Sequence, residues 1–426
     1  MNKLTNWMEA HFVPAAAKFG SQRHLGAIRD SFIAIMPITM AGSIAVLLNV
    51  FFRDLPTTWG MTEFVEKMTP LITINGIVYW GTISIIALAF VFSLGYNLSS
   101  TYDVNPIAGG IIAFASLMMT TPQVDSAGSW GYLHIGGYAG ATGLFTALFV
   151  GLISTMIYVT LTKRNLVIKL PDSVPPAVYK AFAAIIPGLI AMYSVSIVTY
   201  LVDTFAGSSI NDLVLKYIQM PLLGLSQGLV SVIIITFLIQ LFWFFGLHGH
   251  SVLAPIMDGV YMTALNENIA VFQKTGSIAE LPWLWTRGSF DAYSQMGGSG
   301  VTIGLIIAIF IASKRQDQRQ IAKLSAPMGI FNINEPITFG LPIVLNPVYA
   351  IPWLLIPSIC ATIAYLLTSA GVIPPVFVSV PWIMPPGIYA FLATGGSFLA
   401  AAVSLFNVVL SVVLWLPFVK MANKTE

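Results

Sequence analysis

Polar side chains gather in one otherwise apolar stretch of the chain, FNINEPITFG, which holds Asn332, Asn334 and Glu335. A carboxylate between apolar residues is costly inside a membrane and is by default a functional candidate. Pro336 disfavours helix at Glu335 and leaves backbone groups free. Carboxylate and amide groups can together pair with sugar hydroxyls. A solvated cytoplasmic turn would hold the same residues, but the apolar flanks favour a binding site that the protein shelters.

Two histidines, His248 and His250, follow an aromatic run in FWFFGLHGHSVLAP. Histidine changes charge most readily near neutral pH, so it can accept a hydrogen bond from a hydroxyl or pass on a proton. Gly246 and Gly249 bracket His248, which indicates a helix end that opens into a cavity. An ordinary interfacial histidine is the alternative. The His-x-His pair has no third ligand nearby, so we expect no metal and no cofactor.

Two tryptophans are candidates for stacking on the apolar face of a sugar ring, which combines burial of area with a polar handle. Trp382 lies in SVPWIMPPG, an extended segment fixed by prolines, and this context favours binding. Trp243 fits a binding site and the interfacial aromatic belt equally well. Gln219 is a further candidate for substrate contact, although helix packing is the commoner role for such a residue. Asp291 is expected to be a packing or loop residue.

The composition decides the class of protein. The chain has 426 residues, of which 57% are hydrophobic and 8% are charged, against roughly 25% charged in a soluble domain. Most of its outer surface must therefore face lipid. The net charge of +2 gives no basic field for nucleic acid. The single cysteine, Cys360, excludes a disulfide framework and a Cys-rich metal site. No phosphate-binding loop is present, so the chain is not an ATP-driven pump on its own.

The apolar runs predict an all-α integral membrane protein. A helix needs about 20 mostly apolar residues to cross the hydrocarbon core. We expect about ten spans plus one or two partial ones. The convincing candidates are residues 28–52, 77–96, 106–121, 141–162, 181–202, 227–247, 300–313, 350–368 and 397–419, and the weaker ones are 255–264 and 373–392.

The polar segments predict two halves and an orientation. Residues 1–205 hold five regular spans and read as a scaffold. Residues 206–426 are interrupted at 289–300 and 325–347, and broken backbone of this kind builds transporter binding sites. Basic residues concentrate in the N-terminal arm, in 163–180, in 314–323 and in the tail, which places both termini in the cytoplasm. Residues 1–20 are expected to form an amphipathic segment at the membrane surface.

Four motifs in order resemble one known family: LPDSVPPAV, FWFFGLHG, GGSGVTIGL and GIFNINEPITFGLPIVLNP. They look like the IIC subunits of the bacterial phosphoenolpyruvate-dependent sugar phosphotransferase system, in its lactose/cellobiose/diacetylchitobiose branch. The resemblance covers essentially the whole chain. It implies a homodimer in the cell (inner) membrane, with an N-terminal dimerisation half and a C-terminal transport half that contains two re-entrant hairpins and moves as an elevator.

The resemblance also implies a reaction. A cytoplasmic IIB protein, phosphorylated on cysteine by an upstream IIA, would transfer its phosphoryl group to the 6-hydroxyl of a β-linked disaccharide. Glu335 and His248 would contact that hydroxyl, one of them as general base. Asn334 would bind an adjacent hydroxyl, Trp382 would stack on a sugar ring and Trp243 would line the cavity. The role of His250 stays open.

Some alternatives remain at this stage. The membrane segments take up nearly all of the sequence, so IIB and IIA are expected to be separate proteins. A proton- or sodium-coupled sugar symporter could instead use Glu335 as its carrier carboxylate, and a sugar sensor could use the same pocket without turnover. The residues do not distinguish cellobiose, lactose and diacetylchitobiose.

Overall fold

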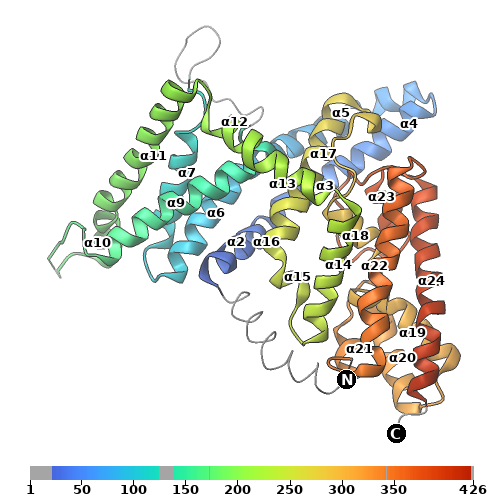
Figure 1. Cartoon of the computed structure of the whole chain (residues 1–426). Helices are drawn as coiled ribbons and strands as arrows, with labels where there is room; N and C mark the ends of the chain where they lie inside the picture. The colour runs from blue at the N-terminus through green and yellow to red at the C-terminus, as the bar shows by residue number, and fades with distance from the viewer. Residues whose placement is uncertain (1–21, 124–137, 172, 342, 424–426) are drawn as a thin grey trace. The chain divides into compact units, whose positions relative to one another are not determined.

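A computed structural model describes residues 22–123, 138–171, 173–341 and 343–423. The regular structure in these ranges is entirely helical (Figure 1). The predicted all-α fold is therefore confirmed. The predicted amphipathic segment at residues 1–20 lies outside the described residues.

Several of the described helices are long and apolar enough to cross a membrane. Six pass by length and composition, and a bent pair, Ile210–Ser226 with Leu229–Phe244, is a seventh if its two arms form one span. The arms meet at 77°. Two shorter apolar helices, Pro106–Met118 and Ser299–Ala312, fall below the length of a full span. The six are Arg23–Asp54, Thr62–Thr101, Ala141–Lys163, Pro176–Ala206, Pro347–Ser369 and Phe398–Ala422.

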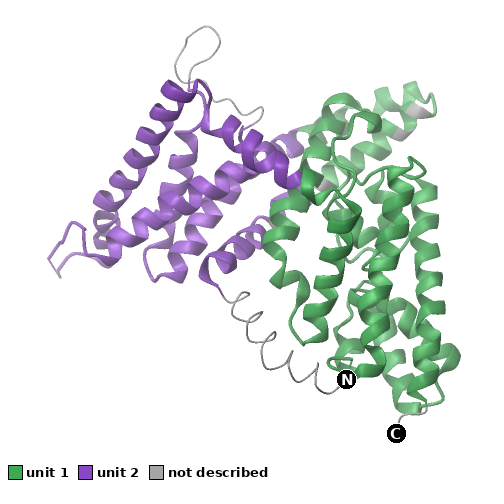
Figure 2. Ribbon diagram, in the orientation of Figure 1, with its two compact units in different colours: residues 1–20, 43–76, 224–426 green, residues 21–42, 77–223 purple. Residues whose placement is uncertain are grey.

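The chain divides into two compact units (Figure 2). Unit 1 comprises residues 1–20, 43–76 and 224–426, and unit 2 comprises residues 21–42 and 77–223. Three helices run from one unit into the other: α3 (Met36–Asn49), α5 (Thr62–Trp80) and α13 (Met220–Ser226). The units are therefore interleaved along the sequence.

Unit 2 packs its helices around α6. The main helices are α2 (Arg23–Ala34), α6 (Ile86–Thr101), α7 (Pro106–Met118), α9 (Leu144–Lys163) and α11 (Ile185–Ala206), with shorter η2 (Ile83–Ile85), η3 (Ala141–Gly143), α10 (Pro176–Ala183), α12 (Ile210–Val214) and η4 (Leu215–Gln219). Phe90, Leu94 and Leu98 on α6 are fully buried in the core. A Cβ at Gly95 would collide with the carbonyl oxygen of Gly109. Small residues thus let α6 and α7 approach closely, as is common between helices in membranes.

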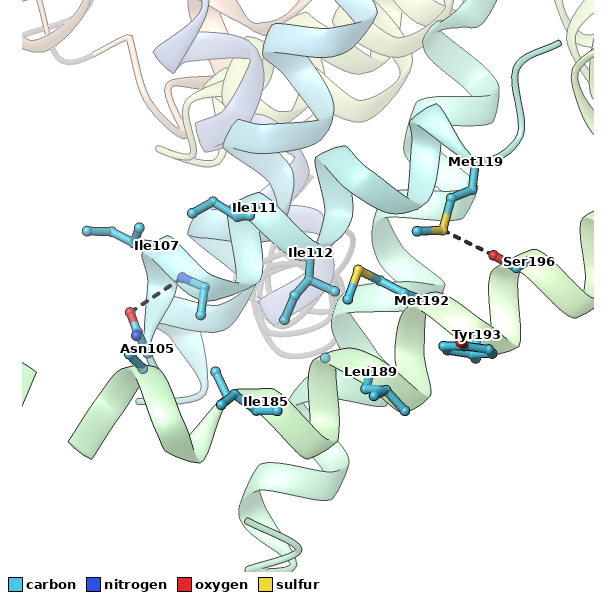
Figure 3. A pocket seen from close by; sticks show the side chains of 14 residues that line it. Asn105, Ile107, Ile111, Ile112, Met119, Ile185, Leu189, Met192, Tyr193 and Ser196 are labelled. Carbon is cyan, nitrogen blue, oxygen red and sulfur yellow. Dashed lines mark hydrogen bonds between the residues drawn. The ribbon is translucent and has the colours of Figure 1, made fainter. Parts of the chain in front are cut away.

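A cavity of about 840 Å³ lies between α7 and α11 in unit 2 (Figure 3). Isoleucine, leucine and methionine side chains dominate its lining. Asn105 and Ser196 are among its few polar residues, and the Ser196 hydroxyl donates to the Met119 sulfur at 3.2 Å. None of the described residues that line it is charged. This apolar surface does not suit a hydroxylated ligand.

Unit 1 is built on long helices with irregular segments between them. The long helices are α14 (Leu229–Phe244), α17 (Met262–Thr275), α19 (Thr302–Ala312), α20 (Gln316–Ile330), α22 (Pro347–Ser369) and α24 (Phe398–Ala422). Helix α14 packs on α22, and α24 packs on both α19 and α22. The short elements are η1 (Val50–Asp54), α4 (Leu55–Thr58), α15 (Gly249–Val252), α16 (Ala254–Ile256), η5 (Met257–Tyr261), η6 (Ile278–Glu280), α18 (Arg287–Tyr293), η7 (Ser299–Val301), α21 (Glu335–Gly340) and α23 (Ile388–Ala393).

Buried irregular backbone at residues 294–298, followed by the single 3₁₀ turn η7, connects α18 to α19. Gly297, Gly298 and Gly300 have φ values of 79°, 90° and 77°, which favour glycine. The Gln240 side-chain oxygen accepts from the Gly300 N–H at 2.9 Å, and the Trp415 indole donates to the Gly300 carbonyl at 3.2 Å. Side chains therefore form the hydrogen bonds that these backbone N–H and carbonyl groups need in apolar surroundings. The predicted interruption at 289–300 is present at residues 294–298 only, because residues 289–293 belong to α18 and 299–300 to η7.

Candidate functional site

The aromatic end of α14 meets α21 and its flanking segments. Trp243 is buried, and its ring lies 4.6 Å from the His248 ring and 6.3 Å from the Phe339 ring of α21, between centroids. The backbone N–H of Leu345, beyond α21, donates to the Phe244 carbonyl at 3.0 Å. Residues from two of the four motifs thus come together in unit 1.

His248 has a fixed ring orientation because it caps α15. Its Nδ1 accepts from the Ser251 backbone N–H at 3.1 Å and lies 2.9 Å from the Ser251 hydroxyl. The Nδ1 lone pair is therefore occupied, and the proton of the neutral ring is on Nε2. The side chain is exposed. His248 consequently presents a hydrogen-bond donor to a ligand rather than a free lone pair.

The negative charge of Glu335 acts on the His248 ring. Two sequence expectations for Glu335 are wrong. It does not lie on unwound backbone, because it is the first residue of α21; Pro336 fits the first turn, where a missing N–H costs nothing. Nor is it sheltered: the side chain is exposed, since it projects from the N-terminal end of a short helix. The carboxylate is therefore accessible to a hydroxyl.

The two asparagines before Glu335 are buried. The Asn334 amide donates to the Thr338 hydroxyl at 3.2 Å, and its Cβ packs against Gly298. The Asn332 amide donates to the carbonyl of Trp382 and to that of Met384. Asn332 thus holds the backbone of Trp382, a residue that is 49% exposed. The ring is free to contact a ligand.

His250 links this group to a second cluster of charges. Its ring lies 6.0 Å from that of His248, and the charge of Arg287 acts on it. Arg287 forms ion pairs with Asp291 at 2.6 Å and with Asp258 at 3.8 Å. All three charged side chains are largely buried. Asp258 and Arg287 were not among the residues predicted from the sequence, and Asp291 was predicted to be a packing or loop residue.

One candidate belongs to the other compact unit. Gln219 belongs to unit 2, where it ends η4 and is fully buried, whereas the remaining candidates belong to unit 1. Gln219 and the other candidates therefore belong to different units. Among the described residues no group of histidine, cysteine, aspartate and glutamate is arranged to hold a metal.

Comparison with known proteins identifies the family. The family model described as "Phosphotransferase system, EIIC" matches residues 29–357. The cellobiose-specific EIIC component of Lactococcus lactis subsp. lactis (strain IL1403) is 39% identical over 100% of this chain and 99% of its own. The chain belongs to the EIIC family of the phosphotransferase system. The oligo-β-mannoside-specific EIIC component of Bacillus subtilis (strain 168) is 35% identical over 97% of this EIIC chain and 92% of its own.

A solved EIIC structure has the same fold. The crystal structure of ChbC, the IIC component from the N,N'-diacetylchitobiose-specific phosphotransferase system, matches with a TM-score of 0.90 and 31% identity. The match covers 98% of each chain. The resemblance read from the four motifs is thus confirmed, and this EIIC is a membrane permease that acts in sugar transport with IIB and IIA proteins. The symporter alternative finds no support among these relatives.

Proposed function

We propose that this EIIC imports a β-linked disaccharide of the cellobiose, diacetylchitobiose or lactose type, and that a separate phosphorylated IIB protein phosphorylates its 6-hydroxyl. The relatives support the substrate class: their names specify cellobiose, oligo-β-mannoside and N,N'-diacetylchitobiose. The observation that carries the proposal is the exposed Glu335 carboxylate, whose charge acts on a His248 ring that presents its Nε2 proton.

The chemistry assigns different roles to these two groups. The oxygen of the sugar hydroxyl forms a bond to phosphorus while the bond between phosphorus and the IIB cysteine sulfur breaks. The hydroxyl proton needs an acceptor as this happens. The Glu335 carboxylate takes it, because the Nδ1 lone pair of His248 is occupied by Ser251. His248 donates from Nε2 and fixes the sugar, since positioning and electrostatics dominate phosphoryl transfer.

The remaining contacts follow from exposure and burial. Trp382 stacks on a sugar ring through its exposed face, and Trp243 forms part of the wall behind His248. Asn334 contacts an adjacent hydroxyl with its carboxamide oxygen, since its amide nitrogen is engaged with Thr338. His250 completes the candidate set within unit 1 and is supported by its ring, which lies 6.0 Å from that of His248. Gln219, in unit 2, stays a separate prediction.

The same proposal includes the architecture of the transporter. About ten spans and two re-entrant hairpins would form a scaffold and dimerisation half, residues 1–205, and a transport half, residues 206–426, that moves as an elevator. The interrupted backbone of residues 294–301 supports a hairpin there. The chain would form a homodimer in the bacterial cell membrane with both termini in the cytoplasm. The exposed Lys163, Arg164 and Lys180 support that orientation.

Transport assays in vesicles test the proposal. Vesicles containing the protein receive labelled β-disaccharide on the outside and phosphorylated IIB on the inside. We expect sugar phosphate to accumulate inside. Uptake of unmodified sugar driven by a pH step would contradict the proposal and favour a symporter, whereas saturable binding without uptake would favour a sensor. A panel of β-disaccharides then identifies the preferred substrate.

A further inference from the structure

Asn332 holds two backbone segments, at Gly297 and at residues 382–384, with one side chain. Its Oδ1 accepts from the Gly297 N–H at 2.8 Å. Its Nδ2 donates to the Trp382 carbonyl at 2.6 Å and to the Met384 carbonyl at 2.8 Å. Both amide protons and the amide oxygen are thus used within the protein. Asn332 is only 9% exposed, so it has no spare donor for a ligand.

The segment around Trp382 lies between two anchored ends. On one side the Asn268 amide donates to the Val376 carbonyl, and the Phe377 and Val378 N–H groups donate to the Ala393 carbonyl; on the other side the Gly387 N–H donates to the Ser404 hydroxyl. Residues 373–387 lie outside any helix, and Pro381, Pro385 and Pro386 have no N–H to donate. Within this stretch the Met384 N–H bonds only locally, to the Pro381 carbonyl at 2.9 Å. The two bonds from Asn332 therefore fix the backbone that carries the Trp382 ring.

Asn332 also contacts the glycine segment that packs against Asn334, the residue before Glu335. Gly297 adjoins Gly298, and a Cβ at Gly298 would lie 2.6 Å from the Asn334 Cβ and 2.8 Å from the Asn332 carbonyl oxygen. Glu335 follows directly in the chain. Asn332 itself has a φ of 63°, a left-handed conformation that asparagine tolerates better than most residues. The close packing and this backbone conformation hold the amide in one orientation.

We propose that Asn332 is a positioning residue that sets where the Trp382 ring stands relative to the Glu335 carboxylate. It acts through the backbone of Trp382 and does not touch the sugar. The effect of Asn332 on sugar binding rests on the proposed function, whereas its effect on the Trp382 backbone does not. An aspartate at position 332 would keep the acceptor for Gly297 but would place a carboxylate oxygen against the two carbonyls, and so would release the Trp382 segment.

A labelling experiment tests the position of residue 382 without any sugar. The single cysteine, Cys360, is buried, so Trp382→Cys in a Cys360→Ser background gives one reactive thiol. We expect Asn332→Asp to change the labelling rate of that thiol several-fold. Asn407→Asp is the matched control, because the Asn407 amide also bridges two carbonyls in unit 1, those of Tyr293 and Cys360. An equal labelling rate with and without Asn332→Asp would overturn the proposal.

A double-mutant cycle then tests the consequence for binding. We expect Asn332→Asp and Trp382→Ala each to raise the Kd for the β-disaccharide about tenfold, the loss of one good contact. Their combination should be no worse than the weaker-binding single variant, because both remove the same ring contact. Additive losses would overturn the role of Asn332. If the Asn332→Asp variant does not fold, Asn332→Gly replaces it, because glycine tolerates the left-handed φ and adds no charge.

The two tests separate two failures. If the wild-type protein phosphorylates no β-disaccharide but Asn332→Asp still changes the labelling of residue 382, the proposed function is wrong and the positioning role stands. If phosphorylation proceeds and labelling is unchanged, the positioning role is wrong and the function stands.

Discussion

The two nitrogens of His248 do different things, and two substitutions separate them. The carboxamide oxygen of asparagine takes the place of Nδ1, so His248→Asn keeps the acceptor for the Ser251 N–H, now 3.1 Å away, and loses the Nε2 donor. The amide nitrogen of glutamine reaches the place of Nε2, so His248→Gln keeps the donor and loses the cap. The pair tests whether His248 binds sugar or only begins α15.

The expected magnitudes follow from the contacts. Losing a helix cap costs about 1 kcal/mol of stability. A hydrogen bond between neutral partners contributes about 0.5–1.5 kcal/mol, equivalent to about a two- to twelvefold change in Kd. His248→Asn should therefore unfold at the same temperature as the wild type. Its Kd for the β-disaccharide should be about two- to twelvefold higher. His248→Gln should melt at a lower temperature and bind more tightly than His248→Asn.

Calorimetric titration of the purified protein gives Kd, and thermal unfolding of the same samples gives relative stability. The reasoning is refuted if His248→Asn binds as tightly as the wild type while His248→Gln binds weakly. That outcome would make His248 a structural cap and leave Glu335 without its proposed neighbour. Equal binding by all three proteins would remove His248 from the site.

Three further predictions concern the base, the stacking ring and the scaffold. Glu335→Gln should slow formation of sugar phosphate by about 10²–10⁴-fold with Kd nearly unchanged; a near wild-type rate with phosphorylated IIB would exclude Glu335 as the base. Trp382→Ala should weaken binding by about 1–3 kcal/mol, while Trp382→Phe keeps most of the affinity in the same titration; unchanged affinity in the alanine variant would place Trp382 outside the site. Gly95→Ala should destabilise the protein by about 1–3 kcal/mol, because its Cβ would strike the carbonyl of Gly109. Gly224→Ala is its control, because no atom lies within 4 Å of the added Cβ, and thermal unfolding of both variants gives the comparison.

Composition and polar patterning predicted much of the fold and the approximate site. The scarcity of charge indicated helices in lipid, and the glycines and polar residues of 289–300 indicated the break before α19. Through the family that the motifs resemble, Trp243 and His248 were expected in one site, and their ring centroids lie 4.6 Å apart; the roles of the site residues stay predictions. The division of function at residue 205 stays a prediction, since the compact units are interleaved and follow packing rather than chain order.

What the sequence did not reveal depends on partners distant in the chain. Arg287 and Asp291 are four residues apart on one helix, a spacing that could have indicated their ion pair. The second partner, Asp258, lies on η5, and no local pattern connects it to Arg287. Pro336 was read as a helix breaker, although the same residue is favourable in a first turn. Local signals of this kind allow both outcomes, and the packing of the unit decides.

The polar residues of the NINE sequence illustrate how one motif serves two purposes. Asn332 is buried with its whole amide engaged, and Glu335, three positions later, is exposed with its carboxylate accessible. Buried irregular backbone is stable only if its N–H and carbonyl groups are paired, so the first residue serves the structure that lets the second meet a substrate. Loss of the amide should therefore appear in Kd, because it displaces a binding surface. Loss of the carboxylate should appear in kcat, because the proton then has no acceptor. A variant at position 332 that lowered kcat with Kd unchanged would show that the two residues do not divide the work in this way.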